Sequence, residues 1–540
     1  MRSASRNNAC IKIFCERRKL MKKTLSCLLA ALMGCTICAC GSGGGGDKDK
    51  VTLIVDLHGW MPTINTTATA STPNVYNSPR YIAEAFEKLY PEVKIEWART
   101  KNVGGSSNDA SGEMSSYFIN AIEKGTCPAI AFSWGTAYQE RDYYIDLTEY
   151  LEQPNPFETK EELKGKPWKD AFYDYVWDLE RIRTYDGRIV AVPVATYSGT
   201  ASAIYYNCSL MADIGLMDTA KPAADDDYTL GRDEPFTWGN YMDAIDALKA
   251  KYPSAKAITD PNASLTAGNW LLQFNLGPAY MKKLEPVLDK DGDGKVSGKE
   301  KLQGVVDGVF NPVDKPYAQE LLSYIKEYYS TKIKNGDIAG AKDAQEWNDG
   351  KSGFYHAGSW NYSDQLSTPK KYEFSLLPAP MIDESESEYV EVEWVEGLEN
   401  YQPDVDLELN LMKPAFMENG VFNQKKFDYA LKFLQYLTTY ESNSAMISES
   451  NTSMGAVKGV ELPSIIKNSP YKSCQFPVGS VYQWPAGFTS KAGAELDTLM
   501  ASWVKGQMND ADFYRQWNEK QVADAKDYAK ALNITLAAGA

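Results

Sequence analysis

Apolar positions recur at two different periods near the start of the ordered part of the chain. Residues 51–55 form a β-branched run, and residues 93–97 alternate between apolar and polar side chains, both typical of strands. Between them, residues 81–90 have the i, i+3, i+4, i+7 spacing of an amphipathic helix. The positions that define it are Ile82, Ala85, Phe86 and Leu89. Strand, helix and strand with short links predict a βαβ unit, with parallel strands and a right-handed crossover.

A second unit of the same kind follows. A helix is expected around residues 114–124, and the apolar run 128–132 has the length of a buried strand. The loop Ser133-Trp134-Gly135 comes directly after that strand. Repeated strand and helix patterns predict the α/β fold class.

Chain length and charge narrow the choice of protein class. About 500 residues follow the first 39, which is more than one hydrophobic core usually supports, so we expect two large lobes. The net charge is −16, and the first 39 residues carry eight Lys/Arg against one Glu, so the remainder is more acidic still. Nucleic acid binding needs clustered Lys and Arg, and no basic stripe is present. We expect no nucleic acid partner.

The segment 21–47 has the features of a bacterial export signal with a lipidated cysteine at its end and a short tether after it. Lys22 and Lys23 form the basic region, and residues 25–39 are an apolar run too short to span a bilayer comfortably. Ile37-Cys38-Ala39-Cys40 resembles the lipobox of bacterial lipoproteins, in which cleavage precedes the cysteine; Cys35 is a second candidate. The glycine-rich run 41–46 after Cys40 suits a tether. The signal peptide is therefore assigned to residues 1–39, or from Met21, and the lipidated cysteine with its tether to residues 40–47.

Six of the nine cysteines lie at or before Cys40, which leaves Cys127, Cys208 and Cys474 in the exported body. Three cysteines cannot all pair within one chain. A body this large does not need a disulfide framework. We therefore expect buried thiols, with one optional bridge between any two of them.

Residues 289–300 fit the twelve-residue EF-hand pattern. Calcium takes six to eight oxygen ligands, and this spacing supplies carboxylates at positions 1, 3 and 5, a main-chain carbonyl at 7, a hydroxyl at 9 and a bidentate carboxylate at 12. Gly294 permits the sharp turn at position 6, and Val296 at position 8 can pack inward. The alternative is a solvated acidic turn. The ligands would be Asp289, Asp291, Asp293, Lys295, Ser297 and Glu300. One isolated loop favours a structural role over a sensory one.

Several segments, in this order, resemble the extracellular solute-binding proteins of ABC transporters, family 1, the group of maltose-type sugar receptors. None is specific by itself, but together they cover nearly all of the mature chain. The segments are "AEAFEKLYPEVKIEW" (83–97), "YDGRIVAVPVATYSGTASAIYYN" (185–207), "FTWGNYMDAIDALKA" (236–250, with Thr237 as helix N-cap), "WNDGKSGFYHAGSW" (347–360), "FSLLPAP" (374–380), "KFDYALKFLQYLTTYESNSAMI" (426–447) and "NTSMGAVKGV" (451–460). Larger members of the resembled family, including alginate-type receptors, carry a comparable calcium loop.

The resemblance implies a periplasmic-binding-protein type II fold, with two discontinuous α/β lobes joined by hinge strands around a ligand cleft. We place lobe one at 47–195 plus 375–445, and lobe two at 196–374 plus 446–540. It also implies a monomeric receptor that captures a carbohydrate, the size favouring an oligosaccharide, and delivers it to the permease subunits of an ABC importer. Only the lipid would hold it to the membrane, on the extracellular face of a Gram-positive-type envelope.

Sugars are held by flat aromatic faces and planar polar groups, so aromatic and Asp/Asn residues on loops are the candidates for ligand contact. Loops after strands are the favoured place in open α/β sheets. The aromatic candidates are Trp60, Trp134, Tyr197, Trp360 and Trp484. The weaker polar candidates are Asp56, His58, Asn361 and Asp364. Each of these residue types also occurs as a packing or surface residue.

A catalytic function is the alternative to a receptor. His58 and His356 are the two histidines, and no G-x-S-x-G, H-E-x-x-H or Walker motif is present. Paired carboxylates of a glycosidase leave no sequence pattern, so a surface glycoside hydrolase or lyase is the second hypothesis. A glycan-binding lipoprotein without a transporter is the third.

Overall fold

The fold is described from a computed structural model. Among the residues that it describes, no helix combines the length and the apolar character needed to cross a membrane. The predicted export signal, Cys35, Cys40 and Trp134 lie outside the described residues, as does most of the expected helix around 114–124. The described residues are 50–62, 77–98, 121–132, 142–179, 181–197, 202–218, 230–253, 256–259, 271–333, 338–339, 344–397, 405–450 and 453–537.

The first sheet has six strands in the order β14-β4-β11-β3-β1-β2. β1 pairs in parallel with β2, from Val51 against Val93 to Val55 against Trp97, and α2 connects them. This confirms the predicted βαβ unit. The strands are β1 (Val51–Asp56), β2 (Val93–Trp97), β3 (Ile130–Ala131), β4 (Ala191–Tyr197), β11 (Val405–Leu411) and β14 (Ser453–Gly455).

Helices and short hairpins pack around this sheet. Ile82 and Phe86 of α2 are buried, and Phe86 meets Phe433 of α13 with ring centroids 5.0 Å apart. The elements are η2 (His58–Trp60), α2 (Ser78–Leu89), α4 (Thr148–Leu151), η4 (Trp168–Ala171), η5 (Asp174–Asp178), η12 (Lys413–Phe416), β12 (Met417–Glu418), β13 (Val421–Phe422), α13 (Gln424–Leu437) and α14 (Tyr440–Glu449).

The second sheet has five strands in the order β7-β6-β8-β5-β9. Every residue of β5 and β8 is buried, as expected for central strands covered on both faces. The strands are β5 (Ser202–Asn207), β6 (Lys256–Thr259), β7 (Ile338–Ala339), β8 (Ser352–Gly358) and β9 (Phe374–Pro378), with β10 (Glu393–Glu396) and β15 (Gln475–Val478) as a separate pair.

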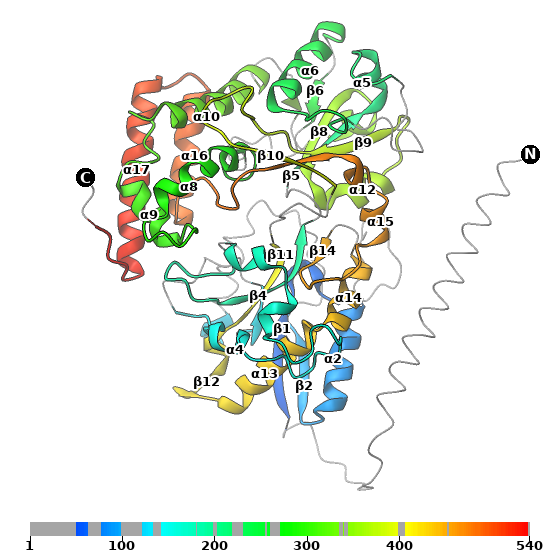
Figure 1. Ribbon diagram of the computed structural model, residues 1–540, viewed down its shortest axis with the longest axis vertical. Helices are drawn as coiled ribbons and strands as arrows, with labels where there is room; N and C mark the ends of the chain where they lie inside the picture. The colour runs from blue at the N-terminus through cyan, green and yellow to red at the C-terminus, as the bar shows by residue number, and fades with distance from the viewer. Residues whose placement is uncertain are drawn as a thin grey trace, which may run out of the picture. The chain divides into compact units, whose positions relative to one another are not determined.

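The chain ends in the helices α16 and α17 of this second part, which pack against each other (Figure 1). Thr237 caps α6 through a reciprocal hydrogen-bond pair with Asn240, which confirms the predicted N-cap. The elements are α5 (Cys208–Asp213), α6 (Trp238–Lys251), η7 (Leu271–Leu276), α8 (Gly277–Leu288), α9 (Gly298–Val306), α10 (Pro316–Glu327), η8 (Tyr328–Ile333), α11 (Ala344–Asn348), η10 (Ser359–Asn361), α12 (Tyr362–Ser367), α15 (Ser464–Lys467), η13 (Pro470–Ser473), α16 (Ser490–Val504) and α17 (Asp510–Ala531).

Buried residues form two separate hydrophobic cores, and we call the parts around them lobe one and lobe two. The core of lobe one is built from residues between Leu53 and Ala195 and between Val405 and Val457, except for Met454, which packs in the core of lobe two. The core of lobe two includes the strands β5, β6, β8 and β9 and the C-terminal helices. The chain therefore passes between the cores three times, after β4, after β10 and after Val457.

Two of the predicted lobe boundaries differ from the structure. Lobe one was expected to resume at residue 375, but β9 pairs with β5, so residues 375–378 belong to the sheet of lobe two. Lobe one was expected to end at residue 445, but β14 pairs with β4 and extends the sheet of lobe one. In both places strand pairing assigns the segment, and the sequence does not state the pairing.

The three cysteines of the body are buried and free, as predicted. Burial raises the pKa of the Cys127 and Cys208 thiols to about 12 and raises that of Cys474 further. Protonated thiols of this kind behave as small apolar side chains.

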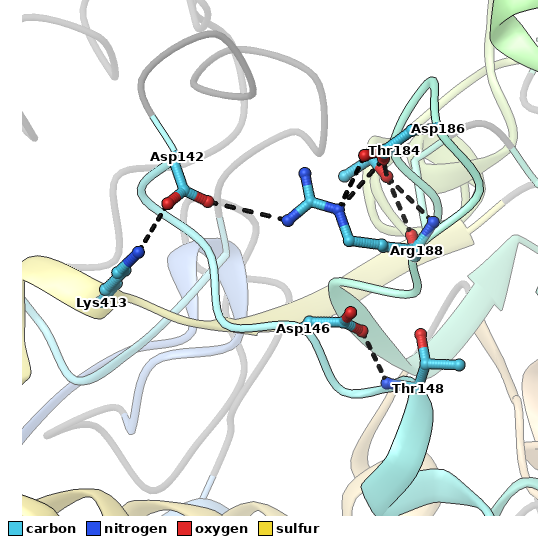
Figure 2. A network of polar contacts seen from close by, with 7 residues as sticks. All are labelled: Asp142, Asp146, Thr148, Thr184, Asp186, Arg188 and Lys413. Carbon is cyan, nitrogen blue, oxygen red and sulfur yellow. Dashed lines mark hydrogen bonds and ion pairs between the residues drawn. The ribbon is translucent and has the colours of Figure 1, made fainter.

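A polar network fixes the turn that leads into β4 (Figure 2). Arg188 donates from Nε to both carboxylate oxygens of Asp186, at 3.1 and 3.0 Å, and its Nη1 lies 3.7 Å from Asp142. Asp142 also forms an ion pair with Lys413, 2.5 Å away on η12. Burial alone would raise the pKa of Asp186, but hydrogen bonds from Thr184 and Arg188 outweigh it and hold the pKa below its usual value. The turn is thereby joined to η12, which follows β11.

Candidate functional site

The strands of lobe one bring several chain segments to one edge of the sheet. β3 is parallel to β1 and antiparallel to β11, and β4 is antiparallel to β11, so β1, β3 and β4 end on the same side. β11 and β14 begin there, with Val405 paired to Thr196 and Ser453 paired to Tyr197. Open α/β sheets bind their ligands at this edge.

Asp406 lies at this edge, at an irregularity of β11. The pairing of β11 with β4 shifts register between Val405 and Leu407. Asp406 is partly exposed, and its Oδ2 accepts hydrogen bonds from Trp60 Nε1 at 3.3 Å and from Ser453 Oγ at 2.5 Å. Segments separated by hundreds of residues thus meet at one carboxylate.

A buried ion pair supports the strand beneath Asp406. Arg181 Nη2 donates to the Val405 carbonyl at 2.6 Å and to Glu408 Oε2 at 2.7 Å. The Glu408 side chain is fully buried and that of Arg181 is 13% exposed. The fully buried Asn410, two residues further, donates to the Val190 carbonyl at 2.8 Å. These contacts hold β11 against its neighbours and leave Asp406 at its outer end.

Lobe two has a buried polar group at the matching end of its sheet. Ser202 Oγ lies 2.7 Å from His356 Nε2, and Asn275 donates to Ser202 Oγ at 3.2 Å. Ser202 opens β5 and pairs with Gly358 at the end of β8. The three side chains are at most 6% exposed. Such burial does not suit a nucleophile, which must reach its substrate, and it does suit anchoring of β5 where the chain enters lobe two.

The predicted ligand residues lie in different places. Trp60 and Asp56 are buried at the edge of lobe one, 5% and 1% exposed. Trp484 is 1% exposed in the core of lobe two, where its ring is edge-on to Phe310 at 5.0 Å. That position fits packing and not ligand contact, because no face of the indole is open.

The remaining predicted residues are described only in part. Asn361 and Asp364 follow β8 and are partly exposed. Burial raises the pKa of Asp364, whose Oδ1 has no hydrogen-bond partner among the described residues. For His58 in η2, Tyr197 at the end of β4 and Trp360 in η10, the backbone alone is described.

The loop at 289–300 brings three of the predicted carboxylates together. Ligand oxygens of Asp289, Asp291 and Asp293 lie within 4.8 Å of one another. Gly292 and Gly294 have φ of +75° and +81°, which glycine adopts without strain. Val296 is buried. The loop therefore gathers hard oxygen donors, the kind that calcium takes.

Glu300 closes the loop from its far end. Its Oε1 accepts from the Lys290 amide at 2.6 Å, and its Oε2 accepts from the Ser297 amide and hydroxyl, each at 2.8 Å. Ser297 is at the same time the N-cap of α9. A carboxylate at position 12 that faces the loop in this way fits the calcium hypothesis.

Asp406, Ser453, Arg181 and Glu408 were not singled out from the sequence as site residues. Their partners lie up to 346 residues away. One signal was present: residues 405–411 read Val-Asp-Leu-Glu-Leu-Asn-Leu, a strand pattern with a polar residue at every second position. In a strand of a covered sheet, such polar groups must find buried partners.

A family model described as a bacterial extracellular solute-binding protein matches residues 82–471. No curated protein sequence matches the chain.

Solved structures of binding proteins share the fold at low sequence identity. A chitin oligosaccharide binding protein is 17% identical with a TM-score of 0.51, over 88% of this chain and 100% of that one. The binding protein msme from Bacillus subtilis subsp. subtilis str. 168, in an open conformation, is 13% identical with a TM-score of 0.52, over 89% and 100%. A cyclic alpha-maltosyl-1,6-maltose binding protein from Arthrobacter globiformis is 16% identical with a TM-score of 0.51, over 88% and 100%.

Proposed function

Because this chain belongs to the bacterial extracellular solute-binding protein family, we propose that it is the receptor of an ABC-type importer and that its ligand is an oligosaccharide. The family acts outside the cytoplasm, and its fold is the type II solute-binding fold. The observation that carries the proposal is the convergence of Trp60, Ser453 and the partly exposed Asp406 at the end of the lobe one sheet where the chain crosses between the two lobes.

The chemistry of these edges supports a carbohydrate. Sugar hydroxyls need acceptors and donors held at fixed positions, and the carboxylate of Asp406 is held by Trp60 and Ser453. Two similar solved structures are described as binding a chitin oligosaccharide and a cyclic maltosyl-maltose. We extend that ligand class to this chain.

The proposed mechanism is closure of the two lobes around the ligand. Each lobe has its own core, and three chain crossings join them. A ligand that contacts both lobes stabilises the closed arrangement by the difference between its affinities for the closed and open states. Closure is then the signal that the permease subunits receive. The receptor acts as a monomer that binds without turnover.

Attachment to the membrane is proposed to occur through lipid on Cys40. The observations in support are the apolar run 25–39, the small residues before Cys40 and the glycine tether after it. Replacement of Cys40 by alanine should release the protein into the medium. A Cys35→Ala protein serves as control and should stay with the cells.

Calcium is proposed as a structural cofactor of lobe two. Asp289, Asp291, Asp293 and Glu300 would supply carboxylates, Lys295 its carbonyl and Ser297 its hydroxyl, directly or through water. The ion would fix the link between α8 and α9, two helices of the lobe two core.

Intrinsic tryptophan fluorescence, titrated with a panel of malto-, chito- and xylo-oligosaccharides, raffinose, amino acids and peptides, tests the proposed ligand class. A saturable change with at least one glycan supports an oligosaccharide receptor. A response to an amino acid or peptide alone overturns the carbohydrate assignment. Release of shorter glycans during the incubation would show an enzyme instead.

A further inference from the structure

Asp406 is held by donors from two other segments of the chain. Trp60 comes from the turn after β1, and Ser453 opens β14. Both hydrogen bonds end on the same atom, Oδ2, at 3.3 and 2.5 Å. Two donors on one oxygen fix the rotation of the carboxylate plane, so Asp406 presents its acceptor sites in a fixed direction.

The position of Asp406 in β11 separates it from the other polar groups of that strand. Glu408 and Asn410 are fully buried and bond to Arg181 and to the Val190 carbonyl. Asp406 is partly exposed, at the register shift of the strand. Irregularities of this kind redirect a side chain and are over-represented beside binding and active sites.

The surroundings of Asp406 are the chain crossings themselves. β11 is the first strand after the second crossing, and β14 is the last strand before the third. Val405 pairs with Thr196, the residue before the end of β4, where the first crossing begins. A ligand bound at this carboxylate would therefore contact the strands that join the lobes.

We propose that Asp406 binds the sugar and determines specificity. Its carboxylate accepts hydrogen bonds from neighbouring hydroxyls of one sugar ring. This inference rests on the proposed carbohydrate function. Trp60 and Ser453 are positioning residues that act through Asp406. Trp60 was expected to stack on a sugar, but it is 5% exposed, and its indole N–H is used to orient the carboxylate.

The role of Asp406 predicts a preference among sugars. A site built to accept a hydroxyl discriminates strongly against a ligand that lacks it, because the carboxylate is then left without its partner. Deoxy analogues of the bound glycan, each lacking one hydroxyl of a ring, should therefore split into two groups. Those that lack a hydroxyl facing Asp406 bind at least about tenfold more weakly.

The test measures affinity by calorimetry with the tightest glycan of the panel above. Asp406→Asn keeps the shape of the side chain but loses the charge that strengthens its hydrogen bonds to the sugar hydroxyls, so the affinity should fall at least about tenfold. Asp406→Ala should lower the affinity further. The matched control is Asp428→Asn, the same change on the exposed face of α13 in the same lobe, which should stay within about twofold. Thermal unfolding shows that each variant is folded, and Asp406→Asn decides the question if Asp406→Ala does not fold.

Ser453 supplies the test of positioning. Ser453→Ala should weaken binding, and Ser453→Thr, which keeps the hydroxyl, should restore it. In the Asp406→Ala background, Ser453→Ala should add no further loss, because it acts through the missing carboxylate. Full affinity of Asp406→Asn and Asp406→Ala for a glycan that the natural protein binds would overturn the inference alone. Failure of the natural protein to bind any glycan would overturn the proposed function, and the inference with it.

Discussion

The ammonium group of Lys295 forms an ion pair with the carboxylate of Asp178 and so joins the predicted calcium loop to lobe one. Val296, beside Lys295, is part of the core of lobe two, and Trp177, beside Asp178, is part of the core of lobe one. The pair thus lies where the two lobes meet. It is partly exposed, so its own contribution to stability is small, on the order of 0.2–1 kcal/mol.

Calcium should raise the melting temperature of the natural protein, since an ion that binds the folded state alone stabilises it by mass action. An Asp289→Ala, Glu300→Ala protein should lose this response, because two of the expected carboxylate ligands are gone. Lys295→Met is the control: it removes the ammonium group but keeps the main-chain carbonyl at position 7, so the response should remain. Calorimetry with calcium, and with magnesium for comparison, makes the measurement. An equal calcium response in the double variant would refute the assignment.

Gly298, the first residue of α9, should not tolerate a side chain. A Cβ there would lie 2.3 Å from Cδ1 of Tyr185. That ring is held edge-on to Tyr528, with centroids 5.3 Å apart. We expect Gly298→Ala to destabilise the protein by about 1–3 kcal/mol in urea unfolding.

Gly493 provides the control for this substitution. It lies within α16, and a Cβ there would have no atom within 4 Å. Gly493→Ala should be neutral or stabilising by about 0.5–1 kcal/mol, because alanine favours the helix interior. Equal stability of the two alanine variants would contradict the packing of Tyr185 on α9.

The buried pair of Arg181 and Glu408 should be costly to break. Removal of either partner leaves the other charge buried without its counter-ion, and the Glu408 side chain is fully buried. Glu408→Gln or Arg181→Met should therefore lower the free energy of unfolding by about 3–5 kcal/mol. The double variant Arg181→Met, Glu408→Met should recover part of this loss, since no charge is then left behind. The exposed pair of Arg515 and Glu519 on α17 is the comparison, where Arg515→Met should leave the stability nearly unchanged. Similar losses at the two pairs would show that Glu408 is more solvated than the structure indicates.

The buried thiols should be silent in the native protein. In a soluble variant that begins at Gly41, Cys127, Cys208 and Cys474 should not react with Ellman's reagent at pH 8, and all three should react in guanidinium. The folded pKa of Cys127 and Cys208 is about 12 against an ordinary value of 9.0. The neutral thiol is therefore favoured by folding, and its contribution to stability is complete below pH 9 and lost as the pH rises toward 12. Rapid reaction of a native thiol at pH 8 would contradict this burial.

The sequence predicts the local elements of this fold well and their long-range pairing less well. The βαβ unit of β1, α2 and β2 and the cap at Thr237 depend on periodicity and on residues within a few positions. The lobe assignment of β9 and β14 depends on which strand each one pairs with, and that is decided across the chain. Prediction failed at the lobe boundaries for this reason.

The candidate site shows the same division between local and long-range signals. The loop from Asp289 to Glu300 is local, and the carboxylates of Asp289, Asp291 and Asp293 lie close together, while calcium binding there stays a prediction. Trp484 looked like a loop aromatic beside a Pro-Gly turn, but Phe310 and Tyr280 enclose it in the core. Asp406 could not be identified as a candidate from the sequence, because the Trp60 and Ser453 side chains that orient its carboxylate reach it only through the fold.

Small-angle X-ray scattering with and without a saturating glycan tests most directly whether an oligosaccharide closes the two lobes. The natural protein should show a smaller radius of gyration with the glycan, because a ligand that contacts both lobes favours the closed state. An amino acid that gives no fluorescence response serves as the control ligand and should leave the radius unchanged. Saturable glycan binding with no change in the radius of gyration would contradict closure as the mechanism.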